Sequence, residues 1–334
     1  MKLKTILVAN NHLSNVGGSE TFTYSLIEEL VHRKEFDVEY FTFQKGVVSE
    51  RIEKELGVKF RSKKTYDLIL ASHNTCVDEL FKSGFVIQTC HGIFPILEQP
   101  SLKANGYVSI SQEVQNHLSS LGFSSKIVLN GINLDRFKSK TSISKELQTV
   151  LSLCQSDEAN RFIKKCCEHL NLKFLKANKF EDNIWEIEKL INNSDLVVGL
   201  GRSAYDAMSC GRPVIVYDNR EYLGAIGDGY VKNILGLSIQ NNCSGRYFNN
   251  QFSEELFIRE LKKYNYKDGD FFREFALKEL NISTNTDKYL FYWKNLLISK
   301  REKKHYKMQK YFGKNLFNFL QNFYGKILNI VRNK

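Results

Sequence analysis

The residues whose types and spacing could do chemistry gather between positions 194 and 218. An apolar strand, Leu196–Gly199, is followed by a short turn, Gly201–Ser203, and then by a helical pattern. A glycine turn at a helix N-terminus offers unpaired backbone N–H groups and the positive end of the helix dipole, and both favour an anion. Gly211 can end the helix in a left-handed cap, and Pro213 begins the next strand. The segment predicts a site for a phosphate-bearing ligand.

The same segment also fits a dinucleotide-binding fingerprint. Gly199, Gly201 and Ala204 follow the spacing G-x-G-x-x-A, and Asp218 ends the next strand, where an acid could bind a ribose. A glycine fingerprint alone is a weak signal, and this one follows a complete first series of strands and helices. A dinucleotide-dependent oxidoreductase therefore stays open as an alternative.

Short apolar runs alternate with longer helical patterns along the chain, which is typical of parallel sheets wound with helices. The predicted strands are Lys4–Asn10, Asp37–Phe43, Tyr66–Ser72, Phe85–Cys90, Tyr107–Ile110, Lys126–Leu129, Thr149–Cys154, Leu172–Lys176, Leu196–Gly199 and Val214–Tyr217. The apolar pattern is interrupted between Asn130 and Glu146, and beyond Ser253 it is helical. We expect an α/β protein with two wound Rossmann-like domains in tandem, residues 1–140 and 141–286, followed by a crossover helix and an amphipathic helical tail, residues 287–334.

The net charge of +11 is concentrated near the C-terminus. Residues 299–334 hold 10 Lys or Arg and 1 acid, a net of +9, so residues 1–298 carry 11 − 9 = +2. Such a nearly neutral body does not indicate nucleic-acid binding.

The 7 cysteines are odd in number and include no CxxC pair, which favours reduced thiols in the cytosol over disulfides or structural zinc. No run approaches the roughly 18 apolar residues of a transmembrane helix, and Thr5–Ala9 is too short for a signal-peptide core.

The tail combines lysines with an apolar stripe at helical spacing. The stripe residues are Phe312, Leu316, Phe319, Leu320, Phe323, Ile327 and Val331. A basic amphipathic helix suits an anionic membrane surface, although a C-terminal helix that packs across the N-terminal domain would also need an apolar face. We expect a cytoplasmic protein attached peripherally to the cytoplasmic face of the membrane. The oligomeric state is left open.

One run of residues carries a family resemblance. Asp206-Ala207-Met208-Ser209-Cys210-Gly211-Arg212-Pro213-Val214 resembles the nucleotide-sugar-binding signature of retaining GT-B glycosyltransferases of the family-four, or group-one, type. Three further resemblances follow in family order: Gly17-Gly18-Ser19-Glu20 after the first strand, His91-Gly92 after the fourth, and residues 128–137 at the domain seam. Together they span about two thirds of the chain, and they imply the GT-B fold.

The resemblance includes a degenerate E-x7-E motif. The family has two glutamates at this spacing, of which the second is usually assigned to the ribose, but here Val198 stands at the first position and Asp206 at the second. The family's Arg and Lys that bind the donor diphosphate are also missing after the first strand of the second domain. Arg202, or else Lys164 or Lys165, could supply the compensating charge.

The resemblance implies a glycosyltransferase that moves a sugar from a nucleotide-sugar to a glycan or lipid-linked acceptor, in cell-envelope or surface-polysaccharide synthesis. Retention of configuration, no metal and no cofactor are expected. The implied catalytic residue is His91, and the implied donor-binding residues are Gly17, Gly18, Gly201, Arg202, Ser203 and Asp206. A non-catalytic GT-B-like binding or scaffold protein and a nucleotide-sugar epimerase remain alternatives. The few acids near Gly199 count against the epimerase.

Two further motifs have simpler structural interpretations. Asn130 is expected to serve as a turn or hinge between the domains. Asp268-Gly269-Asp270 has the spacing of a metal-binding DxD motif, but it follows a helix rather than a strand and is not expected to bind a metal.

Overall fold

The computed structural model describes the backbone of residues 3–177, 184–221 and 224–312, with side chains up to residue 299. Residues 1–289 form one compact unit, which contains both sheets, and a second unit begins at Leu290. The apolar stripe of the predicted tail beyond Phe312 lies outside the described residues. None of the helices in the described part of the chain is long and apolar enough to cross a membrane.

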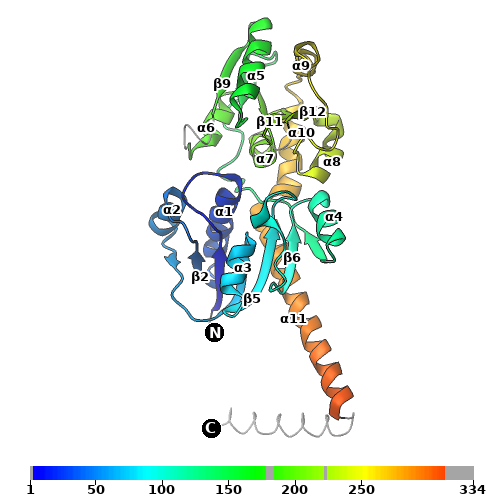
Figure 1. Ribbon diagram of the computed structural model, residues 1–334. Coiled ribbons are helices and arrows are strands. Elements are labelled where there is room, and N and C mark those ends of the chain that lie inside the picture. Colours follow the sequence, from blue (N-terminus) through cyan, green and yellow to red (C-terminus); the bar gives the residue numbers. More distant parts are fainter. Residues whose placement is uncertain (1–2, 178–183, 222–223, 313–334) are drawn as a thin grey trace. The chain divides into compact units, whose positions relative to one another are not determined.

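The N-terminal domain is built on a seven-stranded sheet in the order β3-β2-β1-β4-β5-β6-β7, and all neighbours in it are parallel. Its strands are β1 (Lys4–Ala9), β2 (Phe36–Phe41), β3 (Lys59–Phe60), β4 (Tyr66–Ala71), β5 (Gly84–Cys90), β6 (Gly106–Ser109) and β7 (Ser125–Ile127). The helices that connect them are α1 (Gly18–His32), α2 (Val47–Leu56), α3 (Asn74–Leu80), the short 3₁₀ turn η1 (Ile96–Glu98) and α4 (Gln112–Ser120) (Figure 1).

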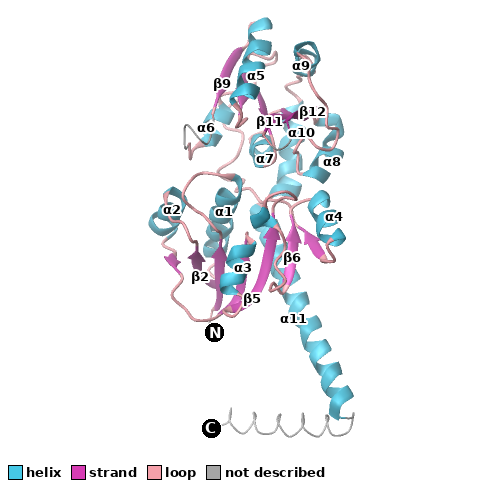
Figure 2. Cartoon of the chain, in the orientation of Figure 1, coloured by secondary structure: helices cyan, strands magenta, loops and turns pink. Residues whose placement is uncertain are grey.

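The C-terminal domain has a five-stranded sheet in the order β12-β11-β10-β8-β9, parallel except for the antiparallel β12. Its strands are β8 (Thr149–Ser152), β9 (Lys173–Lys176), β10 (Leu196–Gly199), β11 (Val214–Arg220) and β12 (Gly224–Tyr230). Helices flank this sheet and continue to Phe312, where the described residues stop (Figure 2). They are α5 (Asp157–His169), α6 (Ile187–Asn192), α7 (Arg202–Ser209), η2 (Lys232–Ile234), α8 (Leu235–Ser238), η3 (Ile239–Asn241), α9 (Glu254–Leu261), α10 (Asp268–Phe275), the π-helical η4 (Ala276–Leu280) and α11 (Ile282–Phe312).

Each sheet has a point where its strand order reverses. In the N-terminal sheet β1 lies between β2 and β4, and in the C-terminal sheet β8 lies between β9 and β10. At such a point the loops after two neighbouring strands diverge and leave a crevice at the carboxyl edge, where α/β proteins bind ligands. The loops after β1 and β10 begin at these two crevices, and together with the first turns of α1 and α7 they carry most of the predicted site residues.

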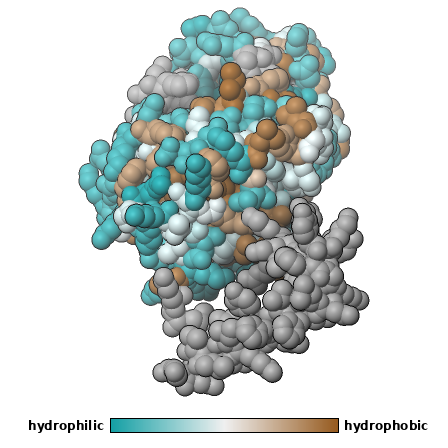
Figure 3. Space-filling view, turned by 60° about the horizontal axis from the view of Figure 1, so that its bottom comes forward, coloured by the Kyte–Doolittle hydropathy of each residue, from teal (hydrophilic) through white to brown (hydrophobic). Residues whose placement is uncertain are grey.

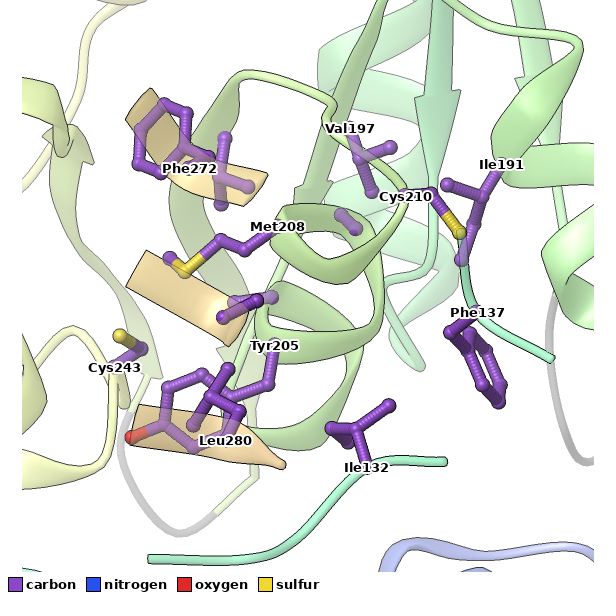
Figure 4. Packing of buried hydrophobic residues seen from close by; sticks show 14 of the residues in the cluster. Ile132, Phe137, Ile191, Val197, Tyr205, Met208, Cys210, Cys243, Phe272 and Leu280 are labelled. Atoms are coloured by element: carbon purple, nitrogen blue, oxygen red, sulfur yellow. The ribbon is translucent and has the colours of Figure 1, made fainter. Parts of the chain in front are cut away.

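Helix α7 is fixed by burial around most of its circumference, from Ala204 to Ser209. Ala204, Tyr205, Ala207 and Met208 are fully buried and pack against β10, α10 and η4 (Figure 4). Gly211 ends this segment at φ +66°, a left-handed conformation that glycine adopts without strain. This packing holds the start of α7, at Arg202, against the carboxyl edge of the sheet.

The two wound domains are confirmed, and two strands were missed. Strand β3 is only two residues long, and β12 contains Gly224, Gly227 and Gly229, so neither produces an apolar run. The last helix begins at Ile282, ahead of the predicted boundary at 287.

All seven cysteines are buried and free, as expected for reduced thiols. On the face shown in Figure 3, apolar side chains stand in separate groups among hydrophilic ones.

Candidate functional site

A cavity of about 460 Å³ lies where loops from the carboxyl edges of both sheets converge. Among the predicted site residues, its lining includes Gly17, Gly18, His91, Arg202, Ser203 and Asp206. Gly201 lines a smaller cavity of about 200 Å³, which shares His91 and Glu98 with the first. The structure thus brings His91 together with the six predicted donor-binding glycines and side chains.

At the start of α7, side chains are better placed than backbone amides to meet a ligand. Gly201 adopts φ +54°, and its N–H donates to the Cys243 carbonyl at 2.9 Å. The Ser203 N–H donates to the Leu200 carbonyl at 3.1 Å. Two of the amides expected to bind a phosphate are therefore already hydrogen-bonded. An anion here would meet the guanidinium of Arg202 and the hydroxyl of Ser203.

Arg202 and Asp206 face each other one helical turn apart. The Arg202 Nε lies 3.3 Å from the Asp206 Oδ1, and Arg202 Nη1 donates to the Gly131 carbonyl at 3.1 Å. Burial raises the pKa of Asp206 and lowers that of Arg202, while their mutual attraction opposes both shifts. Arg202 Nε and Asp206 Oδ1 are buried without a properly aligned hydrogen-bond partner. Both atoms therefore have hydrogen-bonding capacity that the described residues do not use.

The start of α1 carries a negative charge that the sequence reasoning did not anticipate. The Glu20 carboxylate folds back over the first turn of α1, so that a Cβ at Gly17 would overlap Glu20 Oε2. Glu20 pairs with His12 Nε2 at 3.0 Å and accepts from Ser19 Oγ at 2.9 Å. Burial opposes ionisation of Glu20, but these bonds and that of its own amide hold its pKa below the usual value. The positive end of α1 is thus already met by an internal carboxylate.

His91 follows β5 and reaches the cavity as a neutral ring. Its Nε2 is buried without a hydrogen-bond partner, and its ring packs edge-on against Phe22, with 5.4 Å between centroids. Burial lowers the pKa of His91 to about 3; His73 and Arg202 act in the same direction, and Glu20 opposes them. His91 can therefore exchange a hydrogen bond with a ligand, but at neutral pH it is not a cation that would neutralise a phosphate.

Several residues at the cavity were missed by the sequence reasoning. Glu98 lines both cavities, and burial, with repulsion from Glu20, raises its pKa to about 7 against the opposing effect of Arg246. Asn130, expected to be a turn residue, lines the larger cavity with its buried Oδ1 unpartnered, as does Asn242. No sequence motif marks Glu98 or Asn242, and Asn130 was assigned only a structural role, because loops distant in the chain bring these side chains to the cavity.

Other candidates lie elsewhere. Lys164 and Lys165 do not line either cavity: they lie on an exposed face of α5 and pair with Glu168 and Glu254, so the expectation that one of them replaces the missing cation is wrong. Arg202 is the candidate that lines the cavity.

Asp218, the ribose ligand of the dinucleotide interpretation, is buried and committed within the protein. It pairs with Arg220 at 2.5 Å and accepts from the Gln155 and Asn219 amides. Asp268 of the DxD sequence bonds Tyr230 and lies near Lys232, away from the cavity lining. Asp218 is therefore not free to bind a ribose, and Asp268 is not free to bind a metal ion.

No known sequence family and no curated protein matches the chain. Solved structures do resemble it at low sequence identity. A putative UDP-N-acetylglucosamine 2-epimerase from Listeria monocytogenes has a TM-score of 0.54 and 10% identity, over 86% of this chain and 95% of that one. The MnaA–UDP structure from S. aureus has a TM-score of 0.52 and 11% sequence identity, over 88% of this chain and 98% of that one. The glycotransferase of kitacinnamycin has a TM-score of 0.51 and 11% sequence identity, over 86% of this chain and 99% of that one.

Likeness at this level establishes the architecture alone. The chain has the GT-B fold, with two Rossmann-like domains and a cavity between their sheet edges.

Proposed function

We propose that the chain is a glycosyltransferase that uses a nucleotide-sugar donor. The observation that carries this proposal is the division of the cavity into two chemically distinct walls. The C-terminal wall holds the Arg202–Asp206 pair, and the N-terminal wall holds His91 and Glu98. A donor with an anionic half and a hydroxyl-rich half has the matching chemistry.

The C-terminal wall provides for each part of a nucleoside diphosphate. Its apolar lining, Leu153, Ala177, Ile184 and Ile187, suits the face of a nucleobase. Asp206 can accept hydrogen bonds from ribose hydroxyls, and Arg202 can pair with a phosphate oxygen.

Transfer releases a diphosphate on which negative charge grows as the glycosidic bond breaks. Arg202 would stabilise that charge, and the neutral His91 would hydrogen-bond the sugar or its departing phosphate. Because the proposal assigns charge compensation to Arg202, turnover should persist in EDTA. From the sequence resemblance we also propose retention of configuration and a glycan or lipid-linked acceptor of the cell envelope.

A nucleotide-sugar epimerase is the second candidate, and one observation favours it. The few acids near Gly199 had counted against this activity, but the folded chain brings Glu20 and Glu98 to the cavity from the N-terminal domain. Carboxylates and histidines beside a sugar are what proton transfer at a sugar carbon requires. An epimerase would convert its donor without any acceptor.

Two measurements test these proposals. Calorimetry with UDP, GDP, ADP and NAD identifies the ligand class, and we expect a nucleoside diphosphate to bind more tightly than NAD. Incubation with UDP-, GDP- and ADP-sugars, followed by chromatography, separates the activities. Release of nucleoside diphosphate supports transfer, and a changed sugar on an intact nucleotide supports epimerisation. Tight diphosphate binding with neither product would indicate a non-catalytic binding protein.

A further inference from the structure

Glu98 is a carboxylate on the N-terminal wall of the cavity, and the proposed transfer reaction does not yet give it a chemical role. It ends η1 and lines both the larger and the smaller cavity. Within the described part of the chain its carboxylate makes neither a hydrogen bond nor an ion pair. A half-buried acid without such a partner has no evident role in stabilising the fold.

The loop that carries Glu98 is held in place by hydrogen bonds. The side-chain amide of Gln99 donates to the carbonyls of Ile93 and Pro95 at 3.1 and 3.2 Å. The Gln99 carbonyl in turn accepts from Gln88 Nε2 at 2.9 Å. These bonds close the turn on itself and tie it to β5, so the position of Glu98 is set by the sheet.

Gly92 makes room for the Glu98 carboxylate. A Cβ at Gly92 would overlap Glu98 Oε2. The backbone of Gly92 does not adopt a positive φ, so its conformation alone does not call for glycine. The glycine after His91 is therefore explained by the space that the Glu98 carboxylate takes up.

The charges around Glu98 place its ionisation near neutral pH. Burial, the largest effect, and the negative charge of Glu20 on α1 raise its pKa to about 7, and Arg246 from the C-terminal domain opposes them. Neutral His91 and ion-paired Arg220 line the same cavities. A carboxyl group with a pKa near the working pH is well suited to accept and return a proton.

We propose that Glu98 accepts the proton of the hydroxyl group that attacks the donor sugar. This inference rests on the proposed function. In the step, the attacking oxygen bonds to the anomeric carbon, and the bond from that carbon to the phosphate oxygen breaks. The leaving nucleoside diphosphate keeps the electron pair, and the hydroxyl proton passes to the Glu98 carboxylate, which later releases it to water.

The transfer of the proton to Glu98 is the same whether the sugar retains or inverts its anomeric configuration. Attack from either face of the sugar ring releases one proton from the hydroxyl. The resulting pH dependence has a definite sign: because Glu98 must be ionised to accept the proton, turnover should rise with pH through about 7 and then level off.

The test compares the wild type with Glu98→Gln, using the nucleotide-sugar that the donor screen identifies. We expect kcat to fall at least 100-fold and its rise with pH near 7 to disappear. The calorimetric Kd for the nucleoside diphosphate should stay within threefold of the wild-type value. Glu50→Gln is the matched control, since Glu50 is exposed and pairs with Lys54 on α2, away from the lining of both cavities. It should leave kcat and the pH profile unchanged.

A second variant protects the test against misfolding. Gly92→Ala keeps the carboxyl group but displaces it, so it should lower kcat at least 10-fold without a change in Kd. Gly236→Ala, in open space, is its control. If Glu98→Gln turns over at the wild-type rate with the same pH profile, the role of Glu98 is overturned and the proposed function stands. If the wild type binds no nucleoside diphosphate, both proposals fail together.

Discussion

Gly18 and Arg202, at the first positions of α1 and α7, lie against each other in the lining of the cavity. A Cβ at Gly18 would be 3.8 Å from the Arg202 Cβ, which is ordinary van der Waals contact. The starts of two helices from different domains thus meet with one arginine and no larger side chain between them. A side chain larger than that of alanine at position 18 would therefore extend into the space beside Arg202, where both residues line the cavity.

The size of the residue at position 18 should therefore control nucleotide binding. Gly18→Ala should bind the nucleoside diphosphate as the wild type does, because its methyl group fits. Gly18→Leu should weaken binding at least 10-fold while the Tm changes by only a few degrees, since the added atoms extend into the cavity rather than into the core. Calorimetry and thermal unfolding measure the two effects, and equal affinity of the Leu variant would place the diphosphate elsewhere.

Asp206→Ala should weaken nucleoside diphosphate binding by roughly 10- to 150-fold. Charge-assisted hydrogen bonds to the ribose are worth about 1.5–3 kcal/mol. Asp270→Asn, an exposed acid outside the cavity, serves as the control and should bind normally. The ribose assignment is wrong if the Asp206 variant binds its preferred nucleotide as tightly as the wild type.

Stability should fall on mild acidification, in part because of His91. Unfolded His91 takes up a proton near pH 6.5, whereas the folded ring resists protonation until about pH 3. The unfolded state therefore binds more protons between these values, and the free energy of unfolding decreases as pH drops from about 6.5 towards 3.

His91→Gln should make this dependence shallower without removing it. His73, whose pKa burial lowers to about 4, contributes in the same direction. Denaturant unfolding at several pH values decides the point, and parallel curves for the variant and the wild type would show that His91 titrates normally.

The basic tail should bind anionic membranes. Each cation near such a surface adds about 1 kcal/mol, and residues 299–334 carry a net +9. The full chain should co-sediment with vesicles that contain phosphatidylglycerol, whereas a chain ending at Ser299 should stay in the supernatant. Equal partitioning of the two chains, or binding that does not depend on anionic lipid, would contradict the prediction.

The sequence carried enough information for the fold because strands in parallel sheets are continuous apolar runs, such as Leu196–Gly199. It failed at β12, where Gly224, Gly227 and Gly229 leave no apolar run and only pairing with β11 makes the segment a strand. The spacing of apolar residues can predict whether a segment is a helix or a strand. It cannot predict a strand that forms because a distant segment of the chain pairs with it.

The candidate site divides in the same way. Arg202 and Asp206 lie in one motif and could be found by their spacing. Glu98 and Asn242 reach the cavity through loops from different domains, and the position of the Glu20 carboxylate over its own helix depends on His12. The charges that line the cavity therefore could not be predicted from local sequence spacing, because the fold brings them together from separate segments.

The chain crosses between the two domains twice, and the crossings are joined. Ile132 in the first donates its N–H to the Leu280 carbonyl at 2.7 Å, and Ile282 in the second donates to the Ile132 carbonyl at 3.0 Å. Gly131 has no room for a side chain beside Ile282. Two covalent connections tied together in this way act mechanically as a single pivot. A rotation of one domain about that pivot would leave the backbone pairing intact, whereas sliding of one domain past the other would have to break it first.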